Sequence, residues 1–142
     1  MRFDYGGFTI LHGEDDEADA RIMEIVLQKI EYNGKYIREK HGHKLLDRIK
    51  GNGVADHCLL LIDIGLPGVN GKEILEYVRK TEKTKGMPVV IMTGSSSVKD
   101  YNDCIMHGAN GYIKKTANHQ ELIQVCQRFF EGWCIQSRQE FF

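Results

Sequence analysis

The stretch Cys58-Leu59-Leu60-Leu61-Ile62-Asp63-Ile64-Gly65-Leu66-Pro67-Gly68 decides the fold of this chain. Its first five residues are all apolar and show no period-two alternation, which is typical of a strand buried on both faces. The glycines and the proline that follow indicate a turn. Asp63 therefore ends a buried strand, and we expect its carboxylate to be exposed at a loop.

A second group of acids stands in a similar place. Glu14-Asp15-Asp16 follows another short apolar stretch, Phe8-Thr9-Ile10-Leu11. If the two strands are neighbours, their acids converge at one edge of the sheet. Such clustered charges are costly unless a cation lies among them, and carboxylate oxygens favour a hard ion such as Mg²⁺. The sequence therefore predicts a carboxylate–metal site.

The composition is that of an ordinary globular domain. The chain has 142 residues, of which 42% are hydrophobic and 27% charged, and this length corresponds to one domain with a sizeable core. The net charge of −1, with Lys and Arg dispersed along the chain, argues against a nucleic-acid partner. No apolar run has the length of a signal peptide or a membrane span. We therefore expect no membrane partner and a cytoplasmic location.

The cysteines and histidines show no spacing that predicts a metal site. There is no CxxC pair, and each cysteine falls within an apolar pattern, so we expect reduced thiols. The histidines are scattered, although His41 and His43 could meet on one face of an extended segment. The residues concerned are Cys58, Cys104, Cys126 and Cys134, and His12, His41, His43, His57, His107 and His119.

Apolar spacing along the chain predicts a repeated alternation of strand and helix. The helical periodicity is clearest over residues 17 to 31, and Gly51-Asn52-Gly53 ends a short helix. The predicted strands lie at 8–11, 36–39, 58–62, 89–92 and 111–114, and the other helices lie around 45–49, 74–78, 98–107 and 122–130.

Strands that are apolar throughout indicate a parallel sheet covered by helices on both faces. We therefore predict a doubly wound α/β fold, (βα)5. For its five parallel strands we expect the order 2-1-3-4-5, which is the order of the flavodoxin-like form of such folds. Ligands of such sheets collect beyond the carboxyl ends of the strands, where the strand order reverses. That place lies between the strands that end near Asp15 and Asp63.

From about Phe8 to Phe130 the chain resembles a response-regulator receiver domain of the CheY-like kind. No matching residue is specific alone, but together, in this order and at strand ends, they make a strong pattern. They are Glu14-Asp15-Asp16, Asp63 with Leu66-Pro67-Gly68 and Gly71, Thr93-Gly94, and Tyr112 with Lys115.

The resemblance implies a phosphoryl acceptor in a two-component phosphorelay. Asp63 matches the residue that takes the phosphoryl group from the phosphohistidine of a sensor kinase or phosphotransfer protein. The resemblance also implies Mg²⁺ as cofactor, held by Asp15, by Asp63, by the backbone carbonyl of Gly65 and, through water, by Glu14. Asp16 falls beyond the matched pair and is interpreted as a helix-start residue.

Three further residues match the family's switch. Lys115 would pair with the phosphoryl group, and the Thr93 hydroxyl would donate a hydrogen bond to it. Tyr112 matches the aromatic side chain that turns inward with the threonine, so the fourth helix, fifth strand and fifth helix would carry the output. Such a domain is not a conventional enzyme, because it catalyses only its own phosphorylation and dephosphorylation.

Some positions depart from the usual family pattern. His12-Gly13 replaces a pair of apolar residues, and we expect Gly13 to loosen that strand end. Thr116 follows Lys115 where a proline is usual, which leaves the geometry of Lys115 open. Gly65 and Ser95 have small side chains beside the site. We therefore expect no unusually long-lived phosphorylated state.

The carboxyl-terminal part permits two interpretations. We divide the chain into a receiver domain, 1–131, and a short aromatic extension, 132–142. The extension is similar to those of stand-alone regulators that serve phytochrome-type histidine kinases.

The aromatic residues near the end of the chain have two possible roles. A homodimer surface could be covered by Trp133, Phe141 and Phe142. Alternatively, the core face of the last helix could be continued by Phe129, Phe130 and Trp133. Signalling would pass to a downstream protein partner or through a dimer.

Three other functions are compatible with parts of this pattern. A flavodoxin-like electron carrier needs a phosphate loop where the acids at 14–16 stand. A haloacid-dehalogenase-type phosphatase needs a second acid at position 65, which is Gly. A receiver-like scaffold that is never phosphorylated remains the alternative, although the presence of the acids, Thr93 and Lys115 argues against it.

Overall fold

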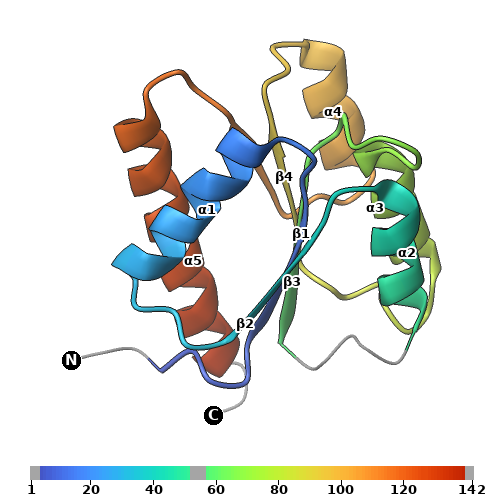
Figure 1. The fold of residues 1–142 in the computed structure, drawn as a ribbon. Coiled ribbons are helices and arrows are strands. Elements are labelled where there is room, and N and C mark those ends of the chain that lie inside the picture. The colour runs from blue at the N-terminus through green and yellow to red at the C-terminus, as the bar shows by residue number, and fades with distance from the viewer. Residues whose placement is uncertain (1–3, 52–56, 140–142) are drawn as a thin grey trace.

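The computed structural model describes residues 4–51 and 57–139, and the side chains up to Trp133. Within these residues, five strands alternate with five helices along the chain (Figure 1). The strands are β1 (Thr9–Gly13), β2 (Lys35–Glu39), β3 (Cys58–Ile62), β4 (Val89–Thr93) and β5 (Gly111–Lys114). The helices are α1 (Glu17–Lys29), α2 (Gly42–Lys50), α3 (Gly71–Lys80), α4 (Val98–Met106) and α5 (His119–Gln139).

The strands form one parallel sheet in the order β2-β1-β3-β4-β5, which confirms the predicted fold and strand order. In the register of the sheet, Gly13 at the end of β1 lies opposite Ile62 at the end of β3. The backbone N–H of Asp63 donates to the carbonyl of Gly13 at 3.1 Å. The residues that follow these two strands therefore leave the sheet at the same point on its upper edge in Figure 1.

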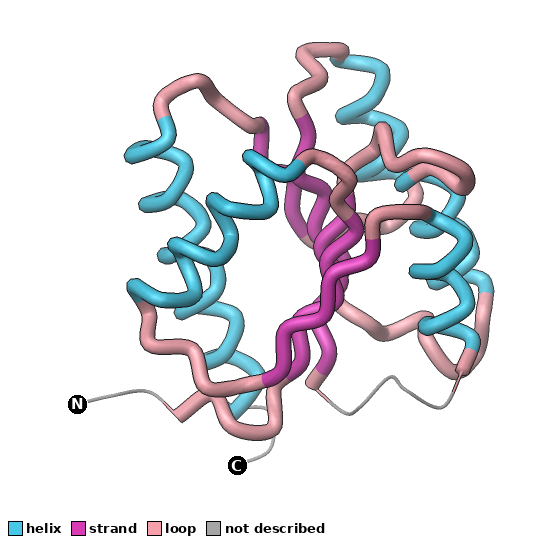
Figure 2. The backbone as a smooth tube through the Cα atoms, viewed as in Figure 1, coloured by secondary structure: helices cyan, strands magenta, loops and turns pink. Residues whose placement is uncertain are grey.

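Helices cover both faces of the sheet, as Figure 2 shows. Helices α1 and α5 lie on one face, and α2, α3 and α4 lie on the other. A hydrophobic core lies on each face of the sheet, and residues of β3 alternate between these two cores. Leu59 and Leu61 pack toward α1 and α5, and Leu60 and Ile62 pack toward the other helices. This double burial explains why the strand is apolar throughout.

Helix α1 begins where the acidic run predicts. The Asp16 side chain accepts a hydrogen bond from the Asp19 N–H at 2.9 Å, which makes Asp16 the N-cap and confirms it as a helix-start residue. The cap fixes the first turn of α1 directly above the carboxyl end of β1.

Gly13 does not loosen the end of β1, contrary to the expectation from its sequence. It is the last residue of β1 and is paired with both neighbouring strands. A Cβ at this position would lie 2.7 Å from Leu45 Cδ2 and 3.0 Å from Leu66 Cδ2. A larger residue here would therefore require the Leu45 side chain to shift.

The last helix is longer than the sequence pattern predicts. Helix α5 continues to Gln139 and passes through the boundary expected between residues 131 and 132. Trp133 packs against the α1/α5 core, with its ring 5.2 Å from that of Phe8 in an edge-on arrangement. This contact favours the interpretation that Trp133 continues the core face. Phe141 and Phe142 lie outside the described residues.

The thiols with described side chains are free and buried, as expected: Cys58, Cys104 and Cys126. Burial raises the pKa of Cys58 to about 12 and that of Cys126 to about 11, so both are inert thiols at neutral pH. The Cys134 side chain lies outside the described residues. No helix in the described part of the chain is long and apolar enough to cross a membrane.

Gly71, the first residue of α3, sets the distance between that helix and the loop after Asp63. A Cβ at this position would lie 2.6 Å from the carbonyl oxygen of Asp63. We therefore expect Gly71→Ala to lower the free energy of unfolding by about 1–3 kcal/mol through overpacking. Chemical denaturation measures this value. Gly86→Ala is the control, since a Cβ there meets nothing within 4 Å; equal losses in both variants would contradict the prediction.

Candidate functional site

The site is built where β1, β3 and β5 end. Glu14 follows β1, Asp63 follows β3, and Lys115 follows β5, while Asp19 comes from the first turn of α1. The N–H of Lys115 donates to the Thr93 carbonyl at 2.8 Å and so continues the sheet beyond β5. The sheet thus aligns the three chain segments, and their side chains meet above its edge.

The ammonium of Lys115 lies among three carboxylates. Its Nζ is 2.7 Å from Glu14 Oε1, 2.8 Å from Asp19 Oδ2 and 2.5 Å from Asp63 Oδ2. Burial alone lowers the pKa of Lys115, but the contacts with Asp19, Asp63 and Glu14 outweigh burial and raise that pKa above its ordinary value. The lysine is therefore a fixed positive charge.

Glu14 is the most deeply buried acid of the site, with no exposed surface. Burial raises its pKa to about 7, and the negative charge of Asp63 acts in the same direction, although Lys115 opposes both. The N–H of Asp16 donates weakly to Glu14 Oε2 at 3.3 Å. Glu14 is thus the carboxyl of this site that takes up a proton near neutral pH.

Asp63 is held at both carboxylate oxygens. Oδ2 accepts from Lys115, and Oδ1 accepts from the Gly65 N–H at 2.9 Å. The side chain keeps 16% of its surface exposed, so a reactant can reach it from solvent. This combination of fixed orientation and access suits a nucleophile.

The acids that the structure brings together differ from the predicted ligand set. Oxygens of Glu14, Asp19 and Asp63 lie within 4.8 Å of one another, whereas Asp15 is exposed and does not belong to this group. The oxygen-only donors fit a hard divalent cation, and the ammonium of Lys115 also lies among them. Ligation by Asp15 and by the Gly65 carbonyl stays a prediction.

Asp19 was missed by sequence reasoning. It lies in the first turn of α1, where acids are common because they favour the helix N-terminus. This general preference gave no reason to assign Asp19 to the site. The feature that could have done so is that the first turn of α1 lies at the same edge of the sheet as Glu14 and Asp63.

Thr93 and Tyr112 belong to the two strands beyond β3, with Thr93 at the end of β4 and Tyr112 within β5. Thr93 is buried, and its Oγ1 accepts from the Ser95 N–H at 3.2 Å. The Tyr112 hydroxyl is buried, and burial raises the pKa of Tyr112.

Helix α4 is attached to this region by charged and polar contacts. Ser95 Oγ donates to Asp100 Oδ2 at 2.6 Å, and Lys72 Nζ of α3 donates to Asp100 Oδ1 at 2.7 Å and to Asp103 Oδ2 at 2.9 Å. The loop after Thr93 is thereby linked to the first turn of α4. A displacement of that loop would be transmitted to the helix.

The outer face of α4 is apolar and exposed. Val98 is 72% and Met106 83% exposed, and Tyr101 and Ile105 are also largely accessible. Tyr101 packs edge-on against Tyr112, with ring centroids 5.2 Å apart. A change in the Tyr112 side chain would therefore alter this face directly.

The Lys115–Thr116 peptide is trans, because the described residues contain no cis peptide bond. The Thr116 hydroxyl instead donates to the Asn118 carbonyl at 3.0 Å. Lys115 therefore reaches the site from a trans backbone.

The histidines do not form a metal site in the described part of the chain. His12 is buried, and its Nδ1 lies 2.6 Å from the Tyr36 hydroxyl. Burial lowers the pKa of His12 to about 3, with Lys115 and Arg38 adding to the effect. It is a neutral core residue with a hydrogen-bond partner.

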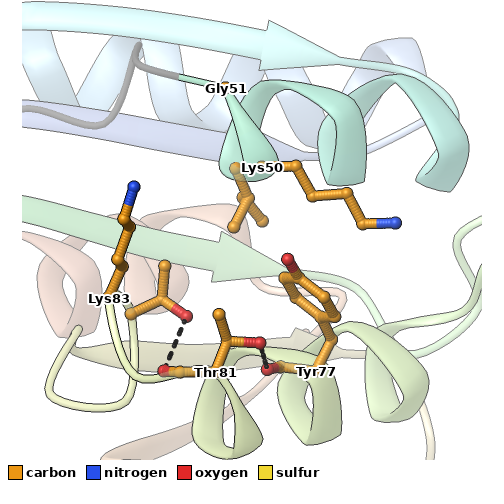
Figure 3. A pocket seen from close by; sticks show the side chains of 7 residues that line it. Lys50, Gly51, Tyr77, Thr81 and Lys83 are labelled. Atoms are coloured by element: carbon orange, nitrogen blue, oxygen red, sulfur yellow. Dashed lines mark hydrogen bonds between the residues drawn. The ribbon is translucent and has the colours of Figure 1, made fainter.

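A pocket of about 250 Å³ lies at the opposite edge of the sheet, between the ends of α2 and α3 (Figure 3). Two of its hydroxyls are used locally: Thr81 donates to the Tyr77 carbonyl, and Thr84 donates to the Val78 carbonyl. Lys50 lies over the Tyr77 ring at 5.2 Å. With these groups already paired, the pocket shows no convergent polar groups comparable to those around Lys115.

The chain belongs to the response regulator receiver domain family, whose sequence model matches residues 10–127. It is thus a receiver domain of the two-component type. Response regulator Rcp1 of Synechocystis sp. is 27% identical over 129 residues, which are 88% of each chain. The regulatory protein FilR2 of Methanothrix harundinacea is 27% identical over 129 residues, 89% of this chain and 83% of FilR2.

Solved structures agree with this assignment. The Mn²⁺-bound form of Rcp1 has a TM-score of 0.80 at 26% identity, covering 89% of this chain and 94% of that chain. The phosphorylated cyanobacterial phytochrome response regulator RcpA has the same TM-score and identity, covering 90% and 94%. The resemblance to receiver domains, including phytochrome-associated ones, is therefore confirmed.

The raised pKa of Glu14 predicts how stability depends on pH. Between about pH 4.5 and 7, the unfolded chain loses the Glu14 proton while the folded chain keeps it, so Glu14 lowers stability as pH rises, by at most about 1.4 kcal/mol per pH unit. The Glu14→Gln variant has no titrating group at this position, so it lacks this decrease in stability with rising pH. We expect its stability relative to wild type, measured by denaturation with a chelator present, to increase from pH 4.5 to 7; the opposite trend would contradict the prediction.

Proposed function

We propose that this receiver accepts a phosphoryl group on Asp63 in a Mg²⁺-dependent reaction and signals through a changed protein surface. The observation that carries the proposal is the geometry of Asp63, whose carboxylate is accessible and is held by Lys115 and the Gly65 N–H. The similarity to a Mn²⁺-bound and to a phosphorylated response regulator supports it.

The chemistry is a phosphoryl transfer between two proteins. An Asp63 oxygen attacks the phosphorus of a phosphohistidine, the P–N bond breaks, and its electron pair stays on the leaving imidazole nitrogen. Hydrolysis of the resulting acyl phosphate by water returns Asp63 and inorganic phosphate. Lys115 and the Thr93 hydroxyl bind the new phosphoryl oxygens. Bound Mg²⁺, held by Glu14, Asp15, Asp63 and the Gly65 carbonyl, would neutralise charge on those oxygens.

The partners follow from this chemistry. The donor is a sensor histidine kinase or a phosphotransfer protein, and the similarity to RcpA favours a kinase of the phytochrome type. The receiver would meet its donor in the cytoplasm. Output would pass to a downstream protein or to a second copy of the chain.

Intact-mass analysis after incubation with acetyl phosphate tests the proposal. We expect a gain of one phosphoryl group that requires Mg²⁺ and is absent in Asp63→Asn, which removes the nucleophile but keeps the shape of the side chain. Asp15→Asn should raise the Mg²⁺ concentration needed for half-maximal phosphorylation, and Asp16→Asn, which alters the neighbouring acid, should not. If wild type gains no phosphoryl group, the unphosphorylated scaffold becomes the better interpretation.

The switch should be visible at α4. With Mg²⁺ and beryllofluoride, a phosphoryl mimic, we expect altered hydrogen–deuterium exchange in residues 98–106, because Thr93 moves and releases the contacts of Ser95. Thr93→Ala should bind the mimic but leave α4 unchanged. Retention of the full α4 response in this variant would show that the signal does not pass through Thr93.

A further inference from the structure

Lys115 is the shared partner of three acids. Its ammonium donates hydrogen bonds to Asp19 Oδ2 and Asp63 Oδ2, and Glu14 Oε1 lies 2.7 Å from Nζ as an ion pair. A phosphoryl group on Asp63 would therefore meet an ammonium that already has partners, one of which is the reacting carboxylate.

Asp63 is the partner that gives up its contact. Phosphorylation would turn its carboxylate into an acyl phosphate, a mixed anhydride, and remove the carboxylate charge that pairs with the ammonium. The N–H that pointed at Asp63 Oδ2 is then free for a phosphoryl oxygen close by. The contacts of Lys115 with Glu14 and Asp19 involve neither the reacting carboxylate nor the incoming group, so they can persist.

Asp19 is well placed to keep its contact. Its backbone N–H is bound by the Asp16 side chain at 2.9 Å, which fixes the first turn of α1. Its carboxylate is 26% exposed, and the Lys115 side chain only 12%. The backbone N–H of Lys115 is held by the Thr93 carbonyl at 2.8 Å, which places the start of its side chain at the edge of the sheet. The ammonium lies at the far end of a flexible side chain, so its position depends on the acids that it contacts.

We propose that Asp19 is a positioning residue that holds the Lys115 ammonium over Asp63, ready for the phosphoryl group. The proposal rests on the proposed phosphorylation of Asp63. It separates the roles of the three acids: Asp63 reacts, and Glu14 and Asp19 keep Lys115 in place. Asp19 would thus act through Lys115 and touch neither the phosphoryl group nor the metal.

Two other roles for Asp19 make different predictions. As a metal ligand, it would set the Mg²⁺ requirement. As a simple negative charge, it would repel the anionic phosphoryl donor, so its removal would speed phosphorylation. The variants Asp19→Ala and Asp19→Asn separate these roles, because Asn keeps an acceptor oxygen for the ammonium but carries no charge. Glu24→Gln is the matched control, since it removes a carboxylate from the exposed side of the same helix, where Glu24 pairs with Arg21.

The first measurement needs no metal and no phosphoryl donor. Lysines are acetylated with an amine-reactive ester in the presence of a chelator, and labelling of Lys115 is followed by peptide mass spectrometry. Loss of one charge-assisted hydrogen bond corresponds to about tenfold in an equilibrium constant. We therefore expect Lys115 to react about tenfold faster in Asp19→Ala, with less change in Asp19→Asn and none in Glu24→Gln. Unchanged labelling in Asp19→Ala would overturn the proposal.

The second measurement is the rate of phosphorylation by acetyl phosphate across a Mg²⁺ titration. We expect Asp19→Ala to slow the reaction about tenfold at saturating Mg²⁺, Asp19→Asn to retain most of the rate, and the half-saturating Mg²⁺ concentration to stay unchanged. A large rise in that concentration would assign Asp19 to the metal, and faster phosphorylation in both variants would assign it a repulsive role. Either result overturns the proposal. If wild type is not phosphorylated, the proposed function is refuted. The labelling result then still tests whether Asp19 holds the Lys115 ammonium in place.

Discussion

The ion group around Lys115 is the interaction on which the arrangement of this site depends. The register of β1 and β3 brings Glu14 and Asp63 to one point of the sheet edge, and α1 adds Asp19. Three carboxylates so close together repel one another strongly unless a cation lies among them. The ammonium of Lys115, which follows β5, lies among them and balances part of their charge.

The two cores make this concentration of charge possible. Strands β1 and β3 are buried on both faces, so their ends cannot shift without disturbing packing on each side of the sheet. Gly13 and Gly71 let Leu45, Leu66 and the loop after Asp63 approach closely. The rigid sheet therefore fixes the backbone beneath the acids. Helix α4 is packed less deeply than the sheet, because it contributes one buried residue, Cys104.

Sequence reasoning predicted the convergence of Glu14 and Asp63, because buried strands and their carboxyl ends have a strong local pattern. The strand order came from analogy with flavodoxin-like folds, and the place of Lys115 came from the family resemblance. It did not predict Asp19, since acids in a first helical turn are common for another reason. It also ended the last helix too early. Gly132 disfavours a helix by about 1 kcal/mol, but the packing of Trp133 against Phe8 offsets that preference. The roles of Asp15, Thr93 and Tyr112 still rest on the family resemblance.

The sequence by itself determined the fold class and the edge of the sheet where the acids gather. These follow from periodicity and from the position of charges at strand ends, which are local properties. Only the tertiary structure decided which acids meet Lys115. Glu14, Asp15 and Asp16 are neighbours in the chain, yet one is buried at the ammonium, one is exposed and one caps α1. Side-chain direction at a strand end depends on what packs around it, and that information comes from segments far away in the chain.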